Sequence, residues 1–185
     1  MREKVNKTVM HSYPGMVALV TVHANGCDNI MAAGWHSYIS MDPPLYGVAI
    51  GRDRHTYQML REAGTFAVQF VPFELAQLIQ ESGVYTGNEK DKLQGIGFDR
   101  GETTDAPILH DAYVAYELTT IDRQTYGDHD WFVGEIKTFY KDEQKFLANG
   151  LPDFQALSIP LYLGRSSYAK LDSGAAISSF PVGRS

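Results

Sequence analysis

The sequence lacks the features that mark several common classes of protein. A single cysteine, Cys27, among 185 residues excludes an intrachain disulfide framework, and the six histidines never pair at the short spacing of a zinc site. No apolar run approaches the length of a membrane-spanning helix, and no basic segment leads into an apolar stretch as in a secretory signal. We therefore expect a cytoplasmic protein without a metal site or a membrane partner.

Positive charge is scarce, because 16 lysines and arginines stand against 22 acidic residues and give a net charge of −6. This balance gives no general support for binding nucleic acid, so an anionic ligand would need a local basic pocket. Hydrophobic residues make up 44% of the chain, as in ordinary globular proteins. The lack of repeats and linkers predicts a single domain over residues 1–185, with a core at about 13–170 and a polar C-terminal tail.

Hydrophobic patterning predicts a mainly β protein with a few short flanking helices. The expected strands are rich in β-branched and aromatic residues and cover 16–26, 44–51, 65–71, 112–127, 130–141 and 159–171. Turn signals stand at Asn25-Gly26 and Gly127-Asp128, and the alternation over 65–71 indicates a half-buried strand. Helices are expected over 56–63, with Thr56 as N-cap and Gly64 as stop, and over 73–82, with a polar helix or loop at 88–94. Strands flanking short helices favour a barrel over a parallel sheet.

Two familiar catalytic patterns are missing or incomplete. The G-x-S-x-G elbow of serine hydrolases does not occur. The stretch "GIGFDRG" at 95–101 resembles a dinucleotide fingerprint, but its third glycine comes one residue late and no strand precedes it. We therefore interpret it as a surface turn.

The loop from Arg52 to Thr56 is the strongest candidate for a ligand site. Guanidinium groups, a hydroxyl and free amides at a helix start are what a phosphate monoester prefers, and Arg52, Arg54 and Thr56 supply them. The alternative is a solvated loop whose arginines pair with nearby acids. The small residues from Ala32 to Gly34 and the adjacent Trp35 are also ambiguous, since they could form a packed strand or approach a flat ligand. Together these segments suggest a planar, phosphorylated cofactor.

The order of motifs resembles the flavin reductase-like, FMN-binding split-barrel family. The family pattern "N-x-M-x-A-x-W" corresponds to 29–35, the following serine and "D-P-P" to 40–44, and "R-x-T" to 54–56. Further along, "TFAVQFVP" carries Gln69 where the family has Asn, and "YTGNEKDKL" carries Thr86 where it has Ser. The likeness extends over 13–168 and is greatest to reductases that supply two-component monooxygenases. It implies a mainly β, FMN-binding split β-barrel of Greek-key type.

The resemblance implies roles for particular residues. Asn29, Ala32, Ala33, Gly34 and Trp35 would border the isoalloxazine and ribityl chain, and Ser37 and Ser40 would be hydroxyl partners near the proline elbow. Arg54 and Thr56, with Arg52, would hold the phosphate, and Lys92 would be a more distant helper. His129 matches the position on the nicotinamide side, where the alternative is a turn histidine without a catalytic role. Tyr168 would approach the pocket or be a core aromatic.

The resemblance also implies the activity. The protein would be an NAD(P)H-dependent flavin reductase that binds FMN, forms a homodimer, and supplies reduced flavin to a separate oxygenase or another acceptor. Because the flavin carries out the redox chemistry, no acid–base triad is expected. An FMN-binding electron carrier or storage protein with little NAD(P)H turnover is the alternative, since a fold and its cofactor do not fix the electron donor. A relative that has lost FMN and acts as an interaction module is a third, against which the intact Arg54 and Thr56 argue.

Overall fold

The computed structural model describes residues 3–4, 6 and 14–180, so residue 13, the expected start of the core, lies outside the described part. The strands are β1 (Ala18–Ala24), β2 (Cys27–Ala33), β3 (His36–Met41), β4 (Pro44–Gly51), β5 (Thr65–Phe70), β6 (Phe98–Arg100), β7 (Pro107–Leu109), β8 (Val114–Tyr126), β9 (His129–Lys141), β10 (Ile159–Gly164) and β11 (Ser167–Leu171). The α-helices are α1 (His55–Ala63) and α2 (Ala76–Val84), and the 3-10 turns are η1 (Phe73–Leu75) and η2 (Glu143–Lys145).

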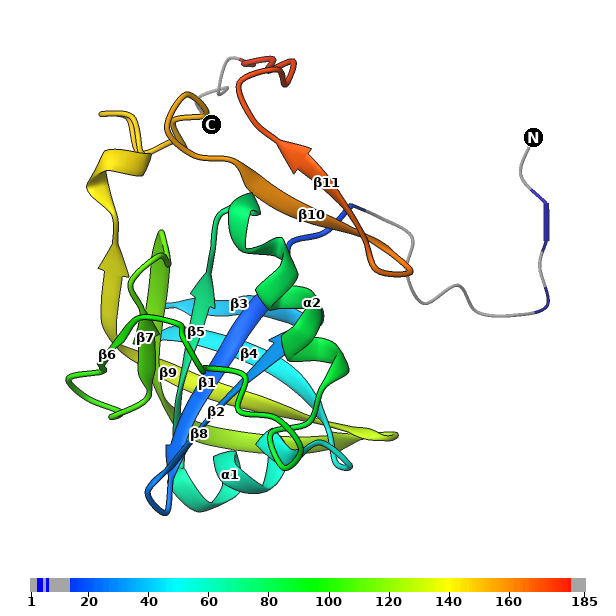
Figure 1. The fold of residues 1–185 in the computed structure, drawn as a ribbon, viewed down its shortest axis with the longest axis vertical. Coiled ribbons are helices and arrows are strands. Elements are labelled where there is room, and N and C mark those ends of the chain that lie inside the picture. The colour runs from blue at the N-terminus through cyan, green and yellow to red at the C-terminus, as the bar shows by residue number, and fades with distance from the viewer. Residues whose placement is uncertain (1–2, 5, 7–13, 181–185) are drawn as a thin grey trace.

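The main sheet curls into a split barrel. Its seven strands run in the order β2-β1-β5-β8-β9-β4-β3, so β2 and β3 are its two edges. A flat sheet of this size would separate its edges by about 29 Å at the usual strand spacing. Only Gly34 and Trp35 join β2 to β3, however, which allows at most about 11 Å between the flanking Cα atoms. The sheet must therefore roll until its edges approach, as Figure 1 shows.

The structure has turns at both positions where the sequence predicts them. Asn25 and Gly26 both have positive φ, 52° and 76°, as a two-residue turn between β1 and β2 requires. Gly127, with φ 61°, begins the tight turn between the long strands β8 and β9. Gly64 ends α1 in the left-handed conformation, with φ 67°, and its N–H donates to the carbonyl of Leu60. These predictions of the two turns and of the helix end are confirmed.

Three local predictions are wrong. Strand β5 is buried on both faces, since Gln69 donates to the carbonyl of Pro107 and accepts from Leu109 N–H in β7, which covers the second face. Residues 159–171 form two strands, because Arg165 and Ser166 adopt positive φ and reverse the chain. Helix α1 has Arg54 as its N-cap, and Thr56 lies two residues further on as the buried second residue of the helix.

The two α-helices bring their ends to the same side of β2. Helix α1 packs mainly against β1, and α2 packs mainly against β2. In Figure 1, α1 closes one end of the barrel while α2 lies across its outer face, and the β10–β11 hairpin extends beyond the opposite end. No helix in the described part of the chain is long and apolar enough to cross a membrane. The N-terminus of α1 and the C-terminus of α2 thus border a common space beside β2.

Candidate functional site: a cavity between the two helix ends

A cavity of about 450 Å³ occupies this space. Its lining comes mainly from four segments: the end of β2 with the Gly34–Trp35 link, Gly51 with the residues from Asp53 to Thr56, the end of α2 with the residues that follow, and His129 at the start of β9. This volume lies within the range of small-molecule binding sites. Backbone pairing holds the segments together, since Ala49 N–H donates to the carbonyl of Trp35 over 2.9 Å.

The cavity gathers most of the site residues predicted from the sequence. Those that line it are Ala32, Ala33, Gly34, Trp35, Arg54, Thr56, Lys92 and His129. Asn29 stands directly behind them, where its side-chain amide donates to the hydroxyl of Thr56 over 2.7 Å. This bond leaves the hydroxyl hydrogen of Thr56 to be donated elsewhere. Residues separated by a hundred positions in the chain therefore meet at one cavity.

Four other predicted residues do not line the cavity. The hydroxyl of Ser37 donates to the carbonyl of Tyr38, and Ser40 borders a separate groove on the outer side of β3. Arg52 donates to the carbonyl of Gly127 instead of facing the cavity. Tyr168 donates to the side chain of Gln80 on α2. Their assignment as flavin ligands stays a prediction.

The end of α2 supplies lining residues that the sequence reasoning did not single out. Ser82, Gly83 and Val84 come from the last turn of the helix, and Tyr85, Thr86 and Gly87 follow it. A Cβ on Gly87 would collide with Asn29 and His55, so the backbone passes very close to the wall of the site there. The motif around Thr86 and Lys92 was the available signal, but its helical part carries no feature distinct from an ordinary amphipathic helix.

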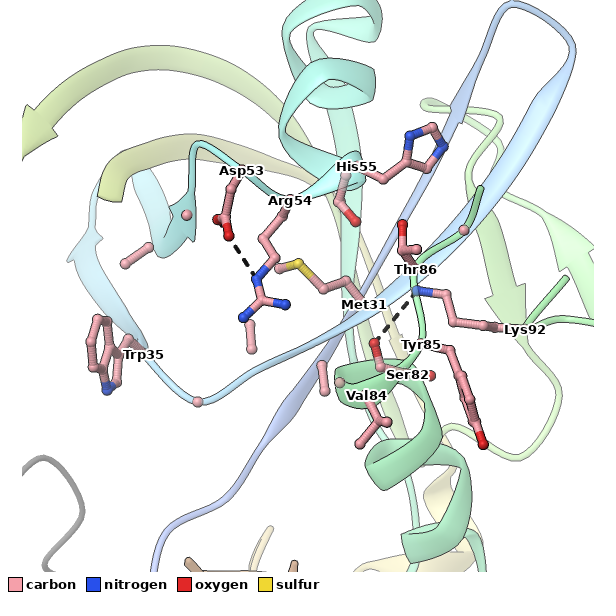
Figure 2. A pocket seen from close by; sticks show the side chains of 18 of the residues that line it. Met31, Trp35, Asp53, Arg54, His55, Ser82, Val84, Tyr85, Thr86 and Lys92 are labelled. Atoms are coloured by element: carbon pink, nitrogen blue, oxygen red, sulfur yellow. Dashed lines mark hydrogen bonds and ion pairs between the residues drawn. The ribbon is translucent and has the colours of Figure 1, made fainter. Parts of the chain in front are cut away.

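Lys92 is a buried cation without an anionic partner. Its side chain lies at one end of the cavity, it is 9% exposed, and it forms no ion pair with any described residue. Its ammonium has only the carbonyl of Ser82 as an acceptor, at 3.5 Å, as Figure 2 shows. Burial, aided by the nearby charge of Arg54, lowers the pKa of Lys92 to about 8. The hydroxyl of Ser82 is buried beside it and has no hydrogen-bond partner among the described residues. Buried polar groups of this kind are suited to hold an anionic ligand.

The start of α1 adds to the positive character of this end. Arg54 is its N-cap residue, no side chain caps the first turn, and the first turn holds no acidic residue. The free amides and the helix dipole both favour an anion at such a terminus. The Arg54 side chain is 58% exposed, and within the described chain its one ion pair is with Asp53, at 3.9 Å. In Figure 2 its guanidinium projects between Trp35 and Lys92.

The opposite end of the cavity is aromatic. The rings of Trp35 and His129 lie 4.7 Å apart between centroids, at an angle of 50°. His129 Nδ1 donates to the carboxylate of Asp128 over 2.7 Å, and this hydrogen bond holds the pKa of Asp128 below its ordinary value. The bond fixes the orientation of the imidazole and directs its Nε2 away from Asp128. Next to the two rings, Gly34 has no atom within 4 Å of where a Cβ would stand, so the link borders open space.

These observations fit a planar ligand with an anionic tail. An aromatic end, a segment of small residues and a buried cationic end follow one another along a single cavity. The Ser82 hydroxyl and the Lys92 ammonium are hydrogen-bond donors of the kind that the acceptor oxygens of a phosphate monoester require. On a split barrel, this arrangement offers a planar, phosphorylated ligand both an aromatic wall and a cationic end.

Comparison with known proteins identifies the family. Residues 10–172 match the flavin reductase like domain, so the chain belongs to the flavin reductase-like family. The crystal structure of an FMN-binding protein from Thermus thermophilus with bound 1-cyclohex-2-enone is 32% identical, covers 97% of this chain and 100% of its own, and superposes with a TM-score of 0.85. An NADH-dependent FMN reductase of Streptomyces nodosus subsp. asukaensis is 26% identical over 74% of either chain. An uncharacterised protein of Aeropyrum pernix is 32% identical over 83% of this chain, which spans 59% of that relative's length.

Proposed function

We propose that the protein is an NAD(P)H-dependent FMN reductase. The observation that carries the proposal is a set of three polar groups, the Ser82 hydroxyl, the Lys92 ammonium and the Arg54 guanidinium, at the end of a cavity whose other end is aromatic. Free flavin without a phosphate would leave these groups unmatched, so FMN fits better than riboflavin. When bound, FMN supplies the hydride-accepting chemistry. The similarity to an NADH-dependent FMN reductase supports the choice of electron donor.

The chain's own residues would bind and orient the two substrates. Arg54, Lys92 and the hydroxyls of Thr56 and Ser82 would hold the phosphate, and the small residues at the end of β2 would let the backbone approach the ring. Trp35 and His129 would border the place of the nicotinamide, and holding the two rings together supplies proximity to the reaction. Reduced flavin would pass to a separate oxygenase or another acceptor. A homodimer remains part of this proposal.

Steady-state oxidation of NADH and NADPH by the purified protein tests the proposal. We expect turnover that depends on added or bound FMN and falls strongly when riboflavin replaces it at the same concentration. His129→Ala should leave FMN affinity near that of the wild type and slow the oxidation. FMN binding without oxidation of either nucleotide would indicate an electron carrier or storage protein instead.

A further inference from the structure

A buried carboxylate joins the cavity's loop to the hairpin that carries His129. Asp130 is 1% exposed and follows His129 directly in β9. Its Oδ2 accepts from the hydroxyl of Tyr57 over 2.8 Å, and its Oδ1 accepts from Thr125 over 2.9 Å. Burial by itself would raise the pKa of Asp130, but these hydrogen bonds and two arginine charges hold it below its ordinary value. The carboxylate is therefore an anionic anchor between α1 and the two strands.

Arg52 contacts both Asp130 and the turn at Gly127 and Asp128, which is the tip of the β8–β9 hairpin. Its Nη1 lies 3.7 Å from Asp130 Oδ1, and its Nη2 donates to the carbonyl of Gly127 over 2.7 Å. The ladder between β4 and β9 ends at the pair Gly51 and His129, and beyond it the Arg52 N–H reaches the carbonyl of Asp128 over only a long bond of 3.4 Å. The guanidinium thus continues the connection past the last regular pair of the ladder.

The β8 side of this tip packs little against the rest of the protein. The last six residues of β8 are exposed, so hydrophobic packing of this strand contributes little at this end of the hairpin. His129 depends on the tip twice, because it is adjacent to the turn and because its Nδ1 donates to Asp128 within the turn. A shift of the tip would therefore move the imidazole away from Trp35 and from the cavity.

We propose that Arg52 is a positioning residue, which clamps the β8–β9 hairpin to the loop before α1 and so keeps His129 at the edge of the flavin cavity. Two arginines of one short loop then have different tasks: Arg54 faces the cavity, and Arg52 faces the hairpin. The catalytic consequence rests on the proposed function, whereas the effect on the contact between His129 and Trp35 does not. Misplacing an orienting group by about 1 Å is enough to slow a reaction strongly.

The fluorescence of Trp35 reports the contact directly. Ring contact with the His129 imidazole quenches the emission of the Trp35 indole, so losing this contact should brighten Trp35 at a fixed pH. The other tryptophan is removed by Trp131→Phe, which all proteins in the comparison carry. His129→Gln identifies the part of the signal that comes from His129. Asp128 and Asp130 remain in every variant, so the acidic surroundings of His129 are constant.

The decisive comparison is Arg52→Gln against Arg123→Gln. Arg123 lies 3.5 Å from the same carboxylate and is similarly exposed, but it belongs to β8 and does not contact Gly127. We expect Arg52→Gln to lose most of the quench by His129, to keep the wild-type affinity for FMN, and to reduce flavin with NADH about tenfold more slowly. Arg123→Gln should retain the quench. If Arg52→Gln does not fold, Arg52→Lys keeps the charge but cannot bridge both partners and should lose the quench too.

Each contrary result has a definite meaning. A quench that survives in the folded Arg52 variant, or that is lost equally in Arg123→Gln, would overturn the clamp. A selective loss of FMN affinity in Arg52→Gln, with riboflavin affinity unchanged, would make Arg52 a phosphate ligand instead. Wild-type protein that binds FMN but oxidises no NADH would refute the proposed reductase activity, while the fluorescence comparison would still decide whether Arg52 positions His129.

Discussion

Replacing Lys92 by Met should stabilise the protein without ligand and weaken its hold on FMN. The change keeps the length of the apolar stem and removes an ammonium that is 9% exposed and has one acceptor, at 3.5 Å. Burying such an unpaired charge is unfavourable, so the free energy of unfolding of the apoprotein should rise by about 1–3 kcal/mol. The same ammonium would form a charge-assisted bond to the phosphate. Its loss should weaken FMN binding by roughly 1.5–3 kcal/mol, or roughly ten- to a hundredfold.

Two measurements test the predicted rise in apoprotein stability and the predicted loss of FMN affinity. Urea denaturation of the apoproteins gives the change in stability, and fluorescence titration gives the affinities for FMN and riboflavin. Riboflavin binding should hardly respond, because riboflavin has no phosphate to contact Lys92. An apoprotein that is destabilised by Lys92→Met, with FMN affinity unchanged, would refute the reasoning and make Lys92 a structural residue.

Three further outcomes follow from the same geometry. Arg54→Ala should weaken FMN binding roughly ten- to a hundredfold and leave riboflavin binding unchanged in parallel titrations, and equal losses would argue against a phosphate ligand. Because the pKa of Lys92 falls from 10.5 to about 8 on folding, the stability of the wild-type apoprotein should increase from pH 8 towards 10.5. The affinity for FMN, but not for riboflavin, should fall as the pH rises through 8. Lys92→Met should flatten both pH profiles. Glu117→Gln should cost about 2–3 kcal/mol of stability in urea denaturation, since its buried carboxylate accepts from two backbone amides and two hydroxyls, and a near-neutral effect would contradict this.

Local signals account for the parts of the fold that the sequence predicts well. Asn25-Gly26 and Gly127-Asp128 force tight turns whatever surrounds them, and Gly64 ends α1 for the same local reason. The double burial of β5 could not be predicted this way, because its second face is covered by β7, forty residues away, through Gln69. The reversal at Arg165-Ser166 lacks a glycine at its centre and leaves no clear mark in the sequence.

The residues of the candidate site also fall into those that local motifs predict and those that depend on tertiary packing. Trp35 and Arg54 stand in compact motifs next to the strands that position them, and the structure brings both to the cavity. Ser82 lies on a helix whose end reaches the cavity only through packing against β2, so nothing near it in sequence indicates a ligand. Arg52 and Arg54 are equivalent as sequence. Which one faces the cavity depends on where the β8–β9 hairpin lies, seventy residues later.

Anaerobic mixing of the FMN-loaded protein with NADH is the most direct test of the central claim. We expect the yellow absorption of bound flavin to bleach while NADH is consumed in equal amount. Protein loaded with riboflavin under the same conditions lacks the phosphate contacts and should retain little flavin to bleach. Flavin that stays bound and oxidised in the presence of excess NADH and NADPH would contradict it.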